Sequence, residues 1–266
     1  MAKKRGRKKK RKTSRKWRSK WTVKRIIGTV VSVVFFLALW GYFSPSTFNR
    51  FKSWLGADDI PIASNNAEYH GIDVSKHQGK IDWKTVATDK NIQFVYIKAT
   101  EGRTLIDKRY RTNITEARKA GLKVGSYHFF TSNRSARDQF ENFRRNVRHN
   151  EQDLIPMVDV EESGCRGATR QQLQKSLGEF MELMRTEYGK YPLLYSQYRF
   201  YNEKLAPEFN KYFIFMARYS VSQPVLKGSG KHNIWQYSEK GKVKGIKGHV
   251  DLDRFVNGTS YRDIKL

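Results

Sequence analysis

Ile155-Pro156-Met157-Val158-Asp159-Val160-Glu161-Glu162 is the stretch that decides the fold class, because an apolar strand pattern ends there in carboxylates. Successive side chains of a strand point to opposite faces, so Asp159 and Glu161 share one face, with Cα atoms roughly 6.5–7 Å apart. Val158 and Val160 share the other face and suit packing. Two carboxylates held side by side repel each other, which raises the pKa of one of them. Such a pair supplies the acid and the base that cleavage of a glycosidic bond requires.

Strand and helix patterns alternate outward from this stretch. Helical patterns cover residues 107–120, 135–147 and 169–188, and the first and last of them end at Gly121 and Gly189. The last three strand patterns have short connections with little room for helices. We therefore expect an α/β fold, an irregular TIM-like (β/α) barrel with a helix-poor last third. A doubly wound open sheet is the alternative, but no Gly-x-Gly-x-x-Gly follows the first strand. The eight strand patterns are residues 69–74, 92–99, 123–130, 154–161, 191–196, 212–219, 233–237 and 250–255.

An uncharged apolar segment, residues 26–43, precedes these patterns. Its 18 residues would span roughly 27 Å as a helix, close to the thickness of a bilayer core. Residues 1–25 hold fifteen Lys or Arg and no acid, and such a cluster marks the cytoplasmic side of a span. We therefore expect a single N-terminal transmembrane helix in the cell (inner) membrane, with the N-terminus cytoplasmic and the rest periplasmic or extracellular. A cleavable signal peptide and a buried core helix are the alternatives.

The chain divides by composition into four segments. We expect a basic cytoplasmic tail at 1–25, a transmembrane anchor at 26–43, a linker at 44–68 and a catalytic domain at 69–266. The formal net charge is +27, but a tail beside anionic lipid headgroups accounts for its own charge, so no nucleic-acid partner is expected. The domain holds 35 Lys or Arg against 22 Asp or Glu, a net +13. That charge suits an anionic polymer, although a basic surface that merely aids solubility is the alternative.

Cysteine and histidine usage argues against disulfide and metal chemistry. Cys165 is the single cysteine, so no intramolecular disulfide is possible. The six histidines are scattered and show no metal-ligand spacing. We expect no metal and no cofactor, and the sequence points to no obligate protein partner.

Acidic residues recur at strand ends, where a barrel of this type has its active site. Asp73 is near the end of the first strand, and Asp159 and Glu161 close the fourth. Asp251 and Asp253 share one face of the last strand. A single Asp at a strand end is more often a helix N-cap or a turn residue. Three strands that each carry inward-facing acids indicate a catalytic site instead.

Aromatic side chains at two strand ends are suited to a sugar cleft. Tyr127-His128-Phe129-Phe130 ends the third strand, and Trp235-Gln236-Tyr237 ends the seventh. Aromatic faces stack on sugar rings, although each ring would suit a hydrophobic core as well. Polar groups favour the cleft at Tyr127, His128, Gln236 and Tyr237.

Six motifs occur in series along the domain. They are HGIDVSKHQG at 70–79, FVYIKATEG at 94–102, GSYHF at 125–129, VDVE at 158–161, WQY at 235–237 and VDLDRF at 250–255. In this order they resemble the family 25 glycoside hydrolases, the Chalaropsis-type lysozymes, and the resemblance covers residues 69 to about 258. Any one motif is weak, whereas the series is specific.

The resemblance implies a membrane-anchored muramidase that cuts the β-1,4 bond between N-acetylmuramic acid and N-acetylglucosamine. Glu161 would be the general acid/base, and Asp159 would stay ionised and stabilise the positive charge that develops on the substrate. Asp73 and Asp251 would orient the acid and the substrate. Asp251 is preferred to Asp253 because the family pattern places its Asp just after the small apolar residue. A protein nucleophile and the substrate's own acetamide both remain open as the attacking group.

The resemblance also implies the partner and the substrate contacts. The partner would be peptidoglycan glycan strands, cut during cell-wall remodelling or turnover. A catalytically silent peptidoglycan-binding scaffold is the alternative function, which the presence of all four carboxylates disfavours. The implied substrate-binding residues are Lys98, Glu101, Tyr127, His128, Trp235 and Tyr237.

Overall fold

The computed structural model describes Ser32 and residues 68–266. All eight predicted strands are present, most of them with shorter ends, and a two-residue strand follows the second. The strands are β1 (Gly71–Val74), β2 (Phe94–Glu101), β3 (Leu105–Ile106), β4 (Val124–Phe129), β5 (Met157–Asp159), β6 (Leu193–Gln197), β7 (Ile214–Ala217), β8 (Ile234–Gly241) and β9 (Val250–Phe255). The helices are α3 (Trp83–Val86), α4 (Tyr110–Lys119), α5 (Ala136–Asn146), α6 (Arg170–Tyr188) and α7 (Tyr198–Phe200), with short 3-10 or π turns η2 (Lys76–Gln78), η3 (His149–Glu151), η4 (Tyr201–Leu205), η5 (Lys227–Ser229) and η6 (Tyr261–Ile264).

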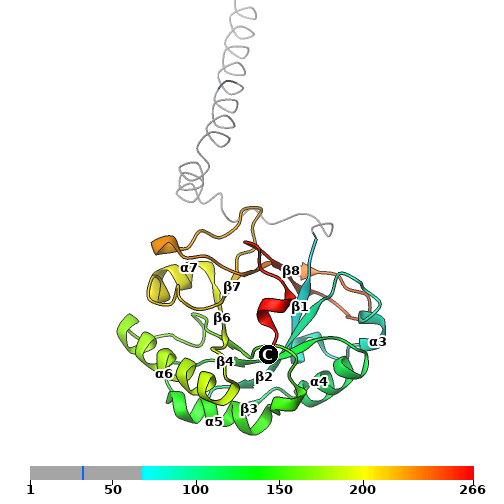
Figure 1. The fold of residues 1–266 in the computed structure, drawn as a ribbon, viewed down its shortest axis with the longest axis horizontal. Coiled ribbons are helices and arrows are strands. Elements are labelled where there is room, and N and C mark those ends of the chain that lie inside the picture. The colour runs from blue at the N-terminus through cyan, green and yellow to red at the C-terminus, as the bar shows by residue number, and fades with distance from the viewer. Residues whose placement is uncertain (1–31, 33–67) are drawn as a thin grey trace, which may run out of the picture. The chain divides into compact units, whose positions relative to one another are not determined.

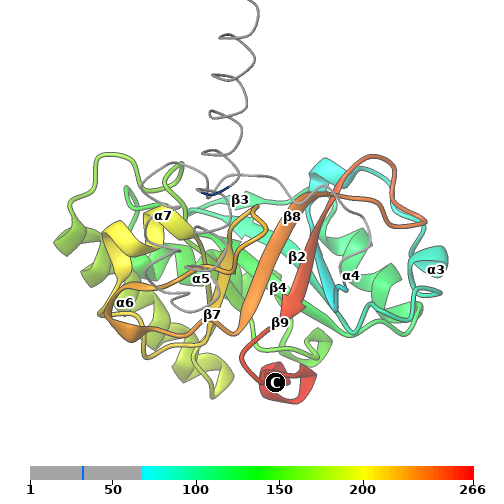
Figure 2. The ribbon, with the colours of Figure 1, turned by 90° about the horizontal axis from the view of Figure 1, so that it is seen from above.

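The sheet closes into an eight-stranded barrel. Its strand order is β1-β9-β8-β7-β6-β5-β4-β2-β3, and β1 also pairs with β2, which joins the two ends. The barrel strands β1, β2 and β4 to β8 run parallel, whereas β9 is antiparallel to both β1 and β8, and the short β3 pairs antiparallel with the edge of β2. Figure 2 shows β8 and β9 as long neighbouring strands on one side of the barrel. The expected α/β barrel is confirmed, and the reversal of its last strand is a feature that the strand pattern did not predict.

Long helices cover only the first part of the barrel, as Figure 1 shows for α4, α5 and α6. Helix α6 begins with a capping box between Thr169 and Gln172 and ends at Gly189, which is left-handed. Its buried stripe packs inward, as the periodicity predicts. After β7, the described chain has no helix longer than four residues. The helix-poor last third is therefore confirmed. The buried stripe consists of Leu173, Leu177, Phe180, Met181, Met184 and Tyr188.

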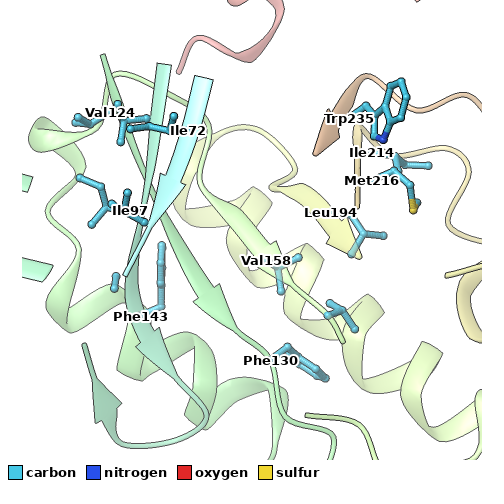
Figure 3. Packing of buried hydrophobic residues seen from close by; sticks show 14 of the residues in the cluster. Ile72, Ile97, Val124, Phe130, Phe143, Val158, Leu194, Ile214, Met216 and Trp235 are labelled. Carbon is cyan, nitrogen blue, oxygen red and sulfur yellow. The ribbon is translucent and has the colours of Figure 1, made fainter. Parts of the chain in front are cut away.

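Alternation along each strand separates two hydrophobic layers. The outer layer lies between the strands and the helices, and Figure 3 shows part of it, with Ile97, Val124 and Val158 on strands and Phe143 on α5. The inner layer fills the barrel. Because one strand supplies both layers in turn, the parity of a position decides whether its side chain faces the barrel interior. The inner layer includes Phe94, Tyr96, Met157, Leu193, Tyr195, Phe215 and Ile234.

Gly71 makes room for the ring that fills the barrel below the first strand end. A Cβ at this position would overlap the Phe94 ring, which is fully buried. Residue 71 pairs with residue 94 across β1 and β2, two residues before Asp73. A glycine here therefore lets the interior pack tightly immediately beneath a carboxylate.

The predicted tail 1–25, span 26–43 and linker 44–68 lie outside the described residues, apart from Ser32 and Glu68. Within the described residues, no helix has the length and apolar character needed to cross a bilayer. The anchor and the domain boundaries therefore remain predictions.

Candidate active site

A cleft of about 280 Å³ opens where the parallel strands end. Its lining includes the four predicted catalytic carboxylates: Asp73 on β1, Asp159 at the end of β5, Glu161 just after it and Asp251 on β9. These residues meet because their side chains all point into the barrel. Their sequence neighbours point the other way and pack in the outer layer. These neighbours are Ile72, Val74, Val158, Val160 and Leu252. Polar and aromatic side chains complete the lining, among them His77, Gln78, Lys98, Tyr127, Phe129, Tyr195, Tyr219, Gln236 and Glu239.

The reversed direction of β9 decides which of its two acids reaches the cleft. An antiparallel strand begins at the rim where its parallel neighbours end. Asp251 pairs with Asp73 in the register and lines the cleft, whereas Asp253 pairs with Gly71, one layer deeper. Asp253 is fully buried, and neither carboxyl oxygen has a hydrogen-bond partner among the described residues. The expected preference for Asp251 thus agrees with its position.

Asp73 and Asp251 form a cross-strand pair of acids. Directly opposed residues in an antiparallel pair have Cβ atoms about 4.5–5.5 Å apart. Burial raises the pKa of Asp73 well above its usual range, and the charge of Asp251 adds to the effect. Burial, together with the charges of Glu239 and Glu161, raises the pKa of Asp251 to about 7. The pair therefore holds a proton under conditions in which exposed carboxyls have lost theirs.

Asp159 and Glu161 form a second coupled pair. Burial raises the pKa of Asp159 well above its usual range, the Glu161 charge raises it further, and the Lys98 ammonium opposes both effects. Burial also raises the pKa of Glu161, against a hydrogen bond from Ser163 and the charge of Lys98. Glu161 is the more exposed of the two. Both carboxyls therefore hold a proton more readily than exposed acids do, and Glu161 is the one that is open to a ligand in the cleft.

Gln236 links the tyrosines of the cleft to Asp73. Its Oε1 accepts hydrogen bonds from the hydroxyls of Tyr195 at 2.9 Å and Tyr219 at 2.8 Å. Its Nε2 donates to Oδ2 of Asp73 at 2.6 Å. The amide is therefore held from both ends, and the residue borders the cleft while being only 1% exposed.

Comparison with known proteins identifies the family. Residues 72–246 match Glycosyl hydrolases family 25. The chain belongs to this family. It is similar to Lysozyme M1 of Streptomyces globisporus, at 31% identity over 233 residues, covering 82% of this chain and 78% of that protein. It is 38% identical over 194 residues to the uncharacterized YegX of Escherichia coli K12, covering 71% of this chain and 70% of YegX. The solved structure of a family 25 glycosyl hydrolase from Bacillus anthracis matches with a TM-score of 0.67 at 30% identity, covering 77% of this chain and 100% of that one.

The surroundings of Asp159 do not favour the ionised state that was expected for it in a family 25 site. Asp159 is 7% exposed, and its Oδ1 has no hydrogen-bond partner among the described residues. A buried carboxylate without donors is costly, so burial favours the neutral form. Because Asp159 and Glu161 repel each other, the two carboxyls titrate as a pair, and the state of one depends on the other.

Two predicted substrate contacts of the family 25 domain lie in the outer layer, away from the cleft. His128 is fully buried, bonds through Nδ1 to the Thr100 hydroxyl at 2.8 Å, and stacks on Phe180. Burial lowers its pKa to about 3, so the ring is neutral. Trp235 is also fully buried, and its Nε1 donates to the Arg218 carbonyl at 2.8 Å. Their strand parity places both outward, so the sugar contacts expected of them are not available in this geometry.

The other predicted contacts divide between the cleft and its edge. Lys98 and Tyr127 line the cleft. Glu101 lies outside the lining and accepts a hydrogen bond from the Lys98 ammonium at 2.8 Å. Tyr237 is 1% exposed and lines a neighbouring groove that shares Tyr219 with the cleft. Glu101 therefore reaches the site only through Lys98, and Tyr237 only through the groove.

Sequence reasoning missed several residues of the lining. Tyr195, Tyr219 and Glu239 carried no motif signal, and Gln236 was noted only for its polar group. Alternation along the Trp235-Gln236-Tyr237 segment could have identified Gln236. When the two aromatic neighbours pack outward, only the middle residue faces into the barrel. Within residues 68–266, no group of three or more His, Cys, Asp or Glu side chains is arranged to hold a metal ion.

Proposed function

We propose that the protein is a lysozyme that hydrolyses the β-1,4 bond between N-acetylmuramic acid and N-acetylglucosamine in peptidoglycan, in remodelling or turnover of the cell wall. One observation carries the proposal: four acids, Asp73, Asp159, Glu161 and Asp251, converge on one cleft of a family 25 domain. Similarity to Lysozyme M1 of Streptomyces globisporus supports the choice of substrate.

Glu161 acts as the general acid in this proposal. Its raised pKa lets it hold a proton at higher pH than an exposed glutamate does, and its partial exposure lets the carboxyl reach the glycosidic oxygen. As the leaving sugar departs, positive charge develops at the anomeric carbon, and Asp159, which lines the same cleft, stabilises that charge by accepting a hydrogen bond from the substrate. Glu161, now ionised, then takes a proton from the attacking water.

Asp73 and Asp251 orient the sugar in this scheme. Both lie on the opposite side of the barrel from β5, on the paired strands β1 and β9. A neutral carboxyl donates one hydrogen bond and accepts others, so a pair that holds a proton can bind a polar substituent such as an acetamide or a hydroxyl.

The test is digestion of purified peptidoglycan by the full-length protein, with mass spectrometry of the released fragments. We expect muropeptides with a reducing N-acetylmuramic end. Glu161→Gln keeps the shape of the side chain but cannot donate the proton, and should lower the rate by a factor of about 10² or more. The exposed Glu162→Gln serves as the matched control and should stay active. No release by the native protein, with binding to peptidoglycan intact, would favour the silent scaffold.

We further propose that residues 26–43 anchor the domain in the cell membrane, with residues 1–25 in the cytoplasm. Support comes from eighteen uncharged residues preceded by fifteen Lys or Arg. An anchored enzyme would work at high effective concentration on the glycan within its reach. Flotation of alkali-washed membranes should retain the protein, and external protease should digest the domain but not the tail. Recovery of the full chain in the soluble fraction would contradict the anchor.

A further inference from the structure

We propose that Gln236 is a positioning residue for this hydrolysis: it holds the Asp73 carboxyl in one orientation and so fixes which of its two oxygens carries a proton. The inference rests on the proposed lysozyme function and deepens the description of the same site.

The amide reaches Asp73 across an intervening strand. Strand β9 lies between β8 and β1, and Gln236 pairs with Asp253 in the register while Asp73 pairs with Asp251. The hydrogen bond from Nε2 of Gln236 to Oδ2 of Asp73 therefore passes over the inner face of β9, between its two acids. The three strands that close the barrel are thus tied together at the level of the cleft floor.

Two phenols decide which way the amide points. The hydroxyls of Tyr195 and Tyr219 both donate to Oε1 of Gln236. Burial raises the pKa of Tyr195 well above its usual range, so its hydroxyl keeps the hydrogen that it donates. In this orientation both phenol hydrogens and the amide N–H that faces Asp73 each have an acceptor. Nε2 therefore faces Asp73.

The orientation of the amide then locates the proton on Asp73. Since Oδ2 accepts the N–H of Gln236, the proton that Asp73 takes up lies on Oδ1. Oδ1 is the oxygen left for Asp251 and for a substituent of the substrate. Without the amide donor, the carboxyl could rotate or carry its proton on either oxygen, and only a fraction of molecules would be ready to react.

Gln236 acts through Asp73 and not by touching the substrate. It borders the cleft but is only 1% exposed, and both ends of its amide are held by hydrogen bonds within the protein. A loss of its amide should therefore change how well the bound substrate reacts more than how tightly it binds. In kinetic terms, kcat falls and KM stays nearly constant.

The experiment measures kcat and KM of the full-length protein on solubilised peptidoglycan strands. Gln236→Leu keeps an uncharged side chain of similar bulk and removes both the acceptor for the two phenols and the donor to Asp73. Gln236→Met keeps the length of the side chain and removes both. We expect each variant to lose about tenfold or more in kcat, with KM within about twofold of native. Gln93→Met, at an exposed position before β2, is the matched control and should equal the native protein.

Native kcat in a folded variant, with KM either native or raised, would overturn the inference. A thermal melt shows whether each variant is folded, and Gln236→Leu decides the matter if Gln236→Met does not fold. Hydrolysis by the native protein with no effect of the Gln236 variants rejects the positioning role alone. No hydrolysis by the native protein rejects the lysozyme function itself.

Discussion

Burial, more than neighbouring charge, sets the protonation of the carboxyls at the scale of single residues. It is the largest cause of the raised pKa at Asp73, Asp159, Glu161, Asp251 and Asp253. Neighbouring charges then adjust each site. The site thus holds protons near neutral pH because its acids sit inside a barrel, while a single lysine at the rim pulls two of them back toward ionisation.

Lys98→Met should move the pH–rate profile to higher pH. The ammonium lowers the pKa of both Asp159 and Glu161, so its removal raises both. Hydrolysis needs one proton on the pair, hence both limbs of the bell-shaped profile should shift upward. Rates measured across the pH range check this. Lys119→Met, at an exposed position on α4, is the control, and a profile for Lys98→Met that overlays it would contradict the assignment.

Asp253→Asn should make the fold more resistant to rising pH. The folded pKa of Asp253 is raised well above its unfolded value, so the folded state binds the extra proton. The free energy of unfolding is therefore highest at pH values below the unfolded pKa and falls as the pH rises toward the folded pKa. Asparagine does not titrate, and this loss should disappear.

Urea denaturation from about pH 4 to about pH 8 measures the effect. The free energy of unfolding of Asp253→Asn, relative to native, should increase along the series. The exposed Asp138→Asn is the control. Parallel curves for the native protein and Asp253→Asn would show that Asp253 titrates alike in both states.

The sequence predicted site residues correctly where the prediction depended on residue type and order along the chain. The prediction failed where it depended on the direction in which a side chain points. Asp73, Asp159 and Glu161 were expected in the cleft and lie there. His128 and Trp235 have suitable chemistry, but parity turns them into the outer layer. Which residues of a strand point into the barrel depends on how the strand is placed in the sheet, and residue types and motifs alone do not specify that placement.

At the scale of elements, β1 and β9 close the barrel and supply two of the four predicted catalytic carboxylates. They meet antiparallel, with Asp73 opposite Asp251. The strand patterns placed all eight barrel strands, because alternation and turn residues are local signals. The reversal of β9 was not predictable from such signals, since strand direction is set by the length and route of a connection. The short β3 consists of two exposed residues, Leu105 and Ile106. Two residues are too few to show an alternating pattern, so the sequence did not predict this strand.

Gly71→Ala should destabilise the domain by about 1–3 kcal/mol through overpacking. The new methyl would overlap the Phe94 ring, which has no exposed side to move toward. Chemical denaturation measures the change. Adding Phe94→Leu should restore part of the stability, because the smaller side chain leaves room for the methyl. A double variant no more stable than Gly71→Ala would show that the cost arises elsewhere.

At the scale of the whole molecule, charge is the property that the sequence describes best. Residues 69–266 carry a net +13 even though the cleft is acidic. The basic surface therefore lies around an acidic site, which suits attraction of an anionic polymer by the surface and cleavage at the centre.

Binding to peptidoglycan should weaken as salt rises. Exposed charges are screened over about 10 Å at 0.1 M and over about 3 Å at 1 M ionic strength. Sedimentation of Glu161→Gln with peptidoglycan, across that range, should show a falling bound fraction. Chitin, an uncharged glycan, is the control polymer and should show no comparable trend. A bound fraction on peptidoglycan that is independent of salt would remove the surface charge from the account of binding.

The antiparallel contact between β1 and β9 has a consequence for the timing of synthesis. Strand β1 cannot pair with β9 until the ribosome has made β9, about 180 residues later. A nascent chain that has already formed β5, with Asp159 and Glu161, still lacks Asp251 and an enclosed interior. Its carboxyls are exposed to solvent, so we expect their pKa values to be ordinary and Glu161 to lack the proton that it needs as a general acid. We therefore expect the hydrolase to gain activity only after translation has passed β9, and to lose it if a protease removes this strand.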